Sequence, residues 1–120
     1  GEDPDIVAKF VAAFTEGAHS DPANYVLTTA KHFPGHGDVT ADSHLELPKL
    51  EAAADRIRGL ELKPFESAIA AGVDTVMTAH MAVPALEPEE IPATVSSRIL
   101  GGVLRDELKF RGLIVTDAMD

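Results

Sequence analysis

Apolar residues near the start of the chain recur at helical spacing. A helix is predicted from Pro4 to about Gly17, because Asp3 offers a side-chain cap and proline has no N–H to leave unpaired at that position. Its apolar face is made of Ile6, Val7, Phe10, Val11 and Phe14. Asp21 and Pro22 then predict a turn.

Two further regions carry the same helical signal. In the middle of the chain, one helix is predicted at residues 50–60. A second is predicted at residues 64–72, where a proline opens it and a glycine closes it. The last helix is predicted to begin at Ser96 and is weakened by the adjacent Gly101 and Gly102. Its inward side chains are Ile99, Leu100, Val103, Leu104 and Leu108.

Three short apolar runs alternate with these helices and predict buried β-strands. They lie at residues 25–30, 73–79 and 113–116 and are rich in β-branched side chains. Apolar strands separated by helices indicate a parallel sheet with both faces covered, which is an α/β architecture. The polar residues Lys31-His32, His80 and Asp117 end the three runs. They should therefore meet at the carboxyl edge of the sheet, where α/β folds bind ligands.

Composition and charge exclude several classes of protein. A chain of 120 residues with 45% hydrophobic residues is sufficient for one domain, over residues 1–120. The formal net charge of −10, with no basic cluster, argues against a nucleic-acid or anionic-membrane partner. No apolar run approaches the roughly 20 residues of a membrane span. Without cysteine there is no disulfide or thiolate chemistry, and the compartment stays open between the cytoplasm and the outside of the cell.

Five polar side chains are candidates for chemistry. Asp42 and His44, two apart, can meet in an extended segment as an acid/base pair, or they form an ordinary Asx-type turn. Asp117 is either a reactive carboxylate at the strand end or a cap for a following helix. Lys31 and His32 can both line one site only if their strand is already bending.

The remaining histidines receive other interpretations. His36 is expected to brace its loop, His80 to be either a satisfied interior residue or a wall of the site, and His19 to lie on the surface. A zinc or iron site remains an alternative on a set of residues that consists of His32, His36, Asp38, Asp42 and His44.

Several motifs occur together and in order: KHFPGHGD at residues 31–38, DSH at 42–44 with LP at 47–48, AH at 79–80 and GLIVTD at 112–117. With the opening GEDP, they resemble the family 3 glycoside hydrolases, most closely the bacterial β-N-acetylhexosaminidase branch. The resemblance covers nearly all of the chain. It implies an α/β fold that is part of a TIM (β/α)8 barrel, with about three β/α units and parallel strands.

The resemblance also implies roles for five residues. Asp117 is expected to be the nucleophile, His44 with Asp42 the acid/base, and Lys31 and His32 the groups that bind sugar hydroxyls. The reaction would be retaining, with attack by Asp117 on the anomeric carbon and later activation of water by His44. The implied partner is an N-acetylglucosamine-containing glycoside, and neither a metal nor another cofactor is needed.

Two other functions stay open. A glycoside phosphorylase, or a β-glucosidase-like relative, fits the same motifs, because a histidine acid/base repels an anionic acceptor less than a glutamate does. A non-catalytic half-barrel is the alternative from another class. In the family an Asp and an Arg from earlier strands grip the sugar. We therefore expect the 120 residues to be a fragment of the catalytic domain, with open strand edges and little activity alone.

Overall fold

A computed structural model describes residues 1–37, 39 and 47–119. The elements, in chain order, are α1 (Pro4–His19), η1 (Pro22–Asn24), β1 (Thr29–Phe33), α2 (Ala54–Gly59), α3 (Lys63–Ala70), β2 (Thr75–Thr78), η2 (Ala93–Val95), η3 (Arg98–Glu107) and β3 (Leu113–Thr116). Within the described ranges, no helix combines the length and apolarity that a membrane span requires.

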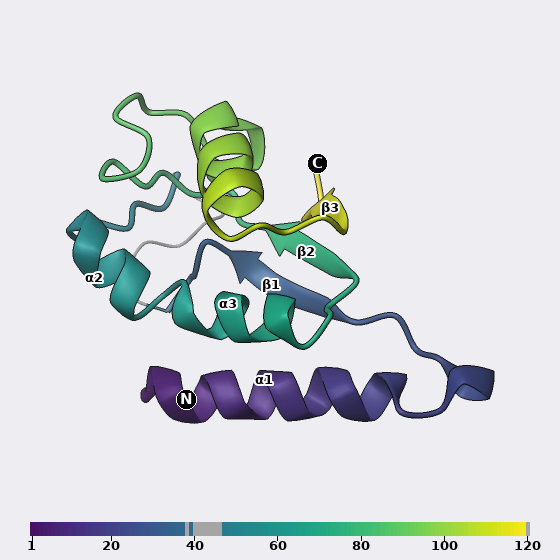
Figure 1. The fold of residues 1–120 in the computed structure, drawn as a ribbon. Helices are drawn as coiled ribbons and strands as arrows, with labels where there is room; N and C mark the ends of the chain where they lie inside the picture. Colours follow the sequence, from purple (N-terminus) through teal and green to yellow (C-terminus); the bar gives the residue numbers. More distant parts are fainter. Residues whose placement is uncertain (38, 40–46, 120) are drawn as a thin grey trace.

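The three strands form one parallel sheet in the order β1-β2-β3. Thr75 of β2 pairs with Thr29 on one side and with Leu113 on the other, so all three strands point the same way. Figure 1 shows α3 beside β1, with α1 running along the outer side of α3. The predicted fold class is confirmed: this is an α/β arrangement of parallel strands and helices, a partial TIM-barrel-like fold.

The first strand begins later than the sequence predicts. The run at residues 25–30 was expected to be buried and extended, whereas β1 starts at Thr29 and Leu27 is 72% exposed. A strand exists only where a neighbour supplies the hydrogen bonds, and β2 begins at Thr75, the partner of Thr29. Residues before Thr28 therefore have no strand to pair with, whatever their β-propensity.

The cap of α1 is confirmed, but its apolar face is only partly covered. One carboxylate oxygen of Asp3 accepts hydrogen bonds from the amides of Asp5 and Ile6 at 2.8 and 3.1 Å. Phe10 and Phe14, expected to point inward, are each 72% exposed. They line a pocket of about 280 Å³ beside β1, the strand at the edge of the sheet.

The core lies between the sheet and its helices. Phe33 is fully buried, and its ring meets that of Phe65 edge to face with centroids 5.2 Å apart. The expected burial holds for β2, whereas β3 is partly open: Leu113 is exposed. Phe33 is the last residue of β1 and belongs to this core, so packing holds the carboxyl end of that strand in place.

The last helix forms where predicted, with an unusual geometry. The Ser96 hydroxyl accepts a hydrogen bond from the Ile99 amide at 3.1 Å, which is the predicted cap. The segment η3 is π-helical, with bonds such as Leu108 N–H to Val103 C=O at 2.9 Å. Such wide turns are rare in proteins. The glycine pair at 101–102 lies in the middle of this segment, where it weakens the preference for an α-helix.

Candidate active site

Two polar side chains from the outer strands meet at the carboxyl edge of the sheet. Nε2 of His32, in β1, lies 3.1 Å from Oδ2 of Asp117, which directly follows β3. The predicted convergence of the strand ends is thereby confirmed for these residues. The parallel topology brings them together across β2, although 85 positions separate them in the sequence (117 − 32).

Asp117 is held as an accessible anion. Its Oδ1 accepts a hydrogen bond from the Ala118 amide at 2.8 Å, and 49% of its side chain is exposed. The pKa of Asp117 lies below its usual 3.8, first because of this amide and then because of electrostatic attraction to the side chains of His32, Lys31 and His80. The carboxylate is therefore ionised at neutral pH, as a nucleophile must be.

The environment of His32 favours a neutral imidazole. Burial is the main cause that lowers the pKa of His32 below 6.5, followed by the charge of Lys31, while Asp117 acts in the opposite direction. Because a carboxylate only accepts hydrogen bonds, the Nε2 atom facing Asp117 carries the proton of the neutral ring. His32 can thus donate a hydrogen bond without adding a second full charge beside Lys31.

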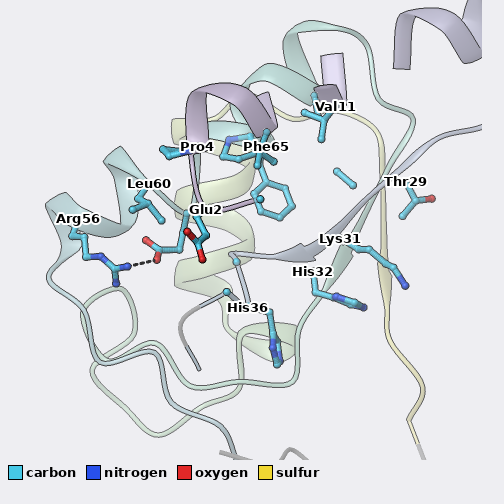
Figure 2. Close-up of a pocket in the computed structure, with 18 residues that line it drawn as sticks. Glu2, Pro4, Val11, Thr29, Lys31, His32, His36, Arg56, Leu60 and Phe65 are labelled. Carbon is cyan, nitrogen blue, oxygen red and sulfur yellow. Dashed lines mark ion pairs between the residues drawn. The ribbon is translucent and has the colours of Figure 1, made fainter. Parts of the chain in front are cut away.

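A pocket of about 910 Å³ lies on the β1 side of this pair: His32 lines it, whereas Asp117 is not among its lining residues. Lys31, His32 and His36 all line it, and Figure 2 shows the three side chains close together. The pairing of β1 with β2 is irregular between Ala30 and Phe33, so the strand is already bending there. That bend meets the condition under which neighbouring residues can line one site.

A buried acid, Glu61, lies against the bend of the chain that follows β1, and it was not identified from the sequence. The Glu61 side chain is 3% exposed, and its Oε1 lies 3.2 Å from Nη2 of Arg56 (Figure 2). Gly35, with φ of +130°, passes over it: a Cβ on Gly35 would approach the Glu61 Cβ to 2.8 Å. A glycine is needed here both for its dihedral and for its size. The only local signal was an acid between two apolar residues.

The other histidines differ in their contacts. His36 lies edge-on to His32, with ring centroids 6.2 Å apart, and is exposed. His80, left open between two interpretations, has partners on both ring nitrogens, Thr94 and Ala118. The prediction that His19 is a plain surface residue is wrong. Its Nε2 lies 2.9 Å from Oδ2 of Asp74, because the end of α1 folds against the start of β2.

Asp42 and His44, the predicted acid/base pair, lie outside the described residues, as does Asp38. The alternative metal site therefore remains untested, since three of its five residues belong to that segment. Among the side chains that the structure does describe, no three His, Asp or Glu residues are grouped as metal ligands. Asp117, Lys31 and His32 are the members of the predicted site that lie within the described residues.

This arrangement can be compared with known proteins. Residues 1–120 match the sequence profile described as the glycosyl hydrolase family 3 N-terminal domain. The chain belongs to this family. In this chain, Asp117 directly follows β3, and Lys31 and His32 lie in the last part of β1. The members of the family cleave glycosidic bonds.

Relatives of the family agree on the kind of enzyme. A β-hexosaminidase of Stenotrophomonas maltophilia (strain K279a) is 45% identical over 116 residues, which are 97% of this chain and 33% of that protein. The solved structure of a family 3 β-N-acetylglucosaminidase from Paenibacillus sp. FPU-7 is 52% identical with a TM-score of 0.79, and the match covers 87% of this chain and 20% of that one.

A third comparison includes a sugar ligand. NagZ from Neisseria gonorrhoeae, solved in complex with N-trifluoroacetyl-D-glucosamine, is 36% identical with a TM-score of 0.71, over 79% of this chain and 28% of that one. The chain thus spans about a third of the length of the curated relatives that it matches.

Proposed function

We propose that the intact protein is a retaining exo-β-N-acetylglucosaminidase in which Asp117 is the nucleophile. The observation that carries this proposal is the ionised, half-exposed Asp117 carboxylate beside His32 at the carboxyl edge of the sheet. The domain that contains it is the family's catalytic (β/α)8 barrel, of which residues 1–120 form a part.

The substrate is a terminal β-N-acetylglucosaminide. The proteins most like this chain are named β-hexosaminidases and β-N-acetylglucosaminidases, and one was solved with an N-acylated glucosamine. The exposed Lys31 ammonium offers three hydrogen-bond donors, and Nδ1 of the neutral His32 ring offers an acceptor, which together suit the hydroxyl groups of a sugar. Both residues line the same pocket, so they can grip one ring.

The reaction proceeds in two steps. In the first, an oxygen of Asp117 bonds to the anomeric carbon as the bond to the leaving oxygen breaks, and His44 gives that oxygen its proton. In the second, His44 takes a proton from water, whose oxygen displaces the carboxylate and releases the sugar. The Ala118 amide already restrains one oxygen of Asp117, which limits the orientations of the carboxylate. Asp42 orients the imidazole of His44.

A phosphorylase is the second candidate, favoured by the charge around the nucleophile. Lys31 contributes positive charge at Asp117, and a histidine in place of an acidic acid/base adds no negative charge. Both features suit phosphate as the acceptor in the second step. The product separates the two functions: the hydrolase releases free N-acetylglucosamine, and the phosphorylase releases the sugar 1-phosphate.

The test is to trap the covalent intermediate. The intact protein is incubated with a 5-fluoro N-acetylglucosaminide, which slows the second step, and its mass is measured before and after proteolysis. We expect one sugar adduct per chain, on the peptide that contains Asp117, and no adduct in an Asp117→Ala control. An adduct on another residue, or turnover that survives in the control, would contradict the proposal.

A further inference from the structure

We propose that His80 is a positioning residue, which holds the turn that carries Asp117 by donating a hydrogen bond to the carbonyl of Ala118. The inference rests on the proposed role of Asp117 as the nucleophile. His80 comes two residues after β2, the central strand, at the same edge of the sheet as His32 and Asp117.

The direction of this hydrogen bond follows from the chemistry of its partner. Nε2 of His80 lies 2.8 Å from the carbonyl oxygen of Ala118. A carbonyl oxygen only accepts, so Nε2 must carry a proton. The proton on this nitrogen is therefore assigned by the contact itself.

Ala118 connects the imidazole to the nucleophile. Its N–H donates to Oδ1 of Asp117 at 2.8 Å, and its C=O accepts from His80 at 2.8 Å. β3 ends at Thr116, so Asp117 and Ala118 lie beyond the sheet's own hydrogen bonds and are exposed. The His80 contact ties this exposed turn to the central strand, and through the Ala118 amide it restrains the carboxylate.

The other ring nitrogen of His80 is held by a buried hydroxyl. Nδ1 of His80 lies 2.8 Å from Oγ1 of Thr94, which also lies 3.0 Å from the Ala79 carbonyl and 3.1 Å from the Thr78 hydroxyl. Thr94 is buried, so its position is set by packing rather than by water. The imidazole thus spans from a rigid anchor to the turn that carries the nucleophile.

The anchor works in both charge states of the ring. The Thr94 hydroxyl has one hydrogen, which goes either to Nδ1 of a neutral ring or to the Ala79 carbonyl. In the second case Nδ1 donates to Thr94 and the ring is protonated on both nitrogens. Nε2–H points at Ala118 in either state, so the positioning does not depend on the charge of His80.

Loss of this donor should affect the chemical step more than sugar binding. Lys31 and His32 would still bind the substrate, whereas the Asp117 carboxylate would sample positions away from the anomeric carbon. A displacement of about 1 Å between reacting groups lowers rates by up to roughly 100-fold. We therefore expect a lower kcat with little change in KM.

The experiment compares two amides at position 80 in the intact protein. In His80→Gln the side-chain amide nitrogen can reach the place of Nε2, whereas in His80→Asn it stops near the place of Nδ1. With an aryl N-acetylglucosaminide, we expect His80→Asn to lower kcat by about 10- to 100-fold with KM within about threefold of wild type. His80→Gln should recover most of kcat, and the rate of trapping by the 5-fluoro glycoside should follow kcat.

Several results would overturn the inference. They are an unchanged kcat and trapping rate in His80→Asn, an effect confined to KM, or no difference between the Asn and Gln variants. Should the position 80 variants not fold, Thr94→Val gives the decision: it removes the anchor of Nδ1, and an unchanged trapping rate would contradict the proposal. If wild type gives no adduct at Asp117, the proposed function itself fails; a labelled wild type with equally fast labelling of His80→Asn refutes the role of His80 alone.

Discussion

Asp74 and Asp117 lie at opposite ends of the sheet, and each is paired with a histidine. Asp74, just before β2, has Nε2 of His19 at 2.9 Å, and Asp117, just after β3, has Nε2 of His32 at 3.1 Å. Both carboxyl groups have pKa values below the ordinary range. By distance and charge alone the two pairs would be taken for the same kind of site.

They differ in how many of their hydrogen bonds the protein itself supplies. Asp74 accepts from the Tyr25 hydroxyl at 2.6 Å and from the Thr28 amide and hydroxyl at 2.7 and 3.1 Å, in addition to His19. Its side chain is 19% exposed. Asp117 has the Ala118 amide and His32, and is 49% exposed.

The number of donors separates a structural carboxylate from a reactive one. A ligand at Asp74 would have to displace several hydrogen bonds to a charged group, each of which contributes about 1.5–3 kcal/mol. Asp117 keeps an open side and a neighbouring Lys31, so it can meet a substrate without losing the protein's own contacts. We infer that Asp74 joins segments, and the open side of Asp117 supports the proposal that this carboxylate is the nucleophile.

The largest effect is expected from Asp117→Asn in the intact protein. The substitution keeps the size of the side chain but removes the charged oxygen that forms the glycosyl bond. We expect kcat to fall by about 10⁴-fold or more, in steady-state assays with an aryl N-acetylglucosaminide. The unfolding midpoint should hardly change, because the carboxylate is half exposed.

Asp74→Asn is the matched control for that variant. It makes the same chemical change at the other end of the sheet, and kcat per folded molecule should stay near wild type. If Asp74→Asn were to abolish turnover and Asp117→Asn were not, the assignment of the two carboxylates would be reversed.

The same Asp74→Asn protein should be markedly less stable. Only one oxygen remains to accept from Tyr25, Thr28 and His19, and the new amide group adds a donor where donors already converge. We expect the free energy of unfolding to fall by roughly 2–4 kcal/mol in urea denaturation. A loss within error of zero would show that the hydrogen bonds to Asp74 do not stabilise the fold.

The pH dependence of that loss has a definite sign. The Tyr25 hydroxyl first, and then the Thr28 amide, hold the pKa of Asp74 below 3.8 in the folded protein. Its stabilisation is therefore fully present above pH 3.8 and declines as the pH falls through the lower, folded-state pKa. The part of the difference between wild type and Asp74→Asn that comes from the protonation of Asp74 should be fully present above pH 3.8 and shrink only in stronger acid.

Features with local causes could be predicted from the sequence. Asp3 and Pro4 begin α1 because a cap acts on the next few amides, and Leu113–Thr116 forms β3 within the predicted bounds. The meeting of Lys31, His32 and Asp117 also followed, since parallel strands place their carboxyl ends at one edge. The family also followed from the sequence, because its motifs are short local runs of residues such as those at 31–38 and 112–117.

Features that depend on distant partners could not. The donors to Asp74 come from residues 46 to 55 positions away, and nothing around His19 in the sequence distinguishes it from a surface histidine. Similarly, β1 begins at Thr29 because β2 begins at Thr75, and Glu61 is buried because Gly35 folds over it. In each case the environment is created by tertiary packing, which local propensity does not contain.

Tyr25→Phe should produce the smallest change in stability. It tests how much of the stabilisation by Asp74 depends on the Tyr25 hydroxyl. The phenol donates to Asp74, yet Tyr25 is exposed, so water can replace it while Thr28 and His19 remain in place. We expect a loss of about 1 kcal/mol in urea denaturation, clearly less than for Asp74→Asn, with kcat unchanged. A loss as large as that of Asp74→Asn would mean that the phenol alone secures the carboxylate. A fall in kcat would mean that the two ends of the sheet are coupled, because Tyr25 has no contact with Asp117 through which it could act directly.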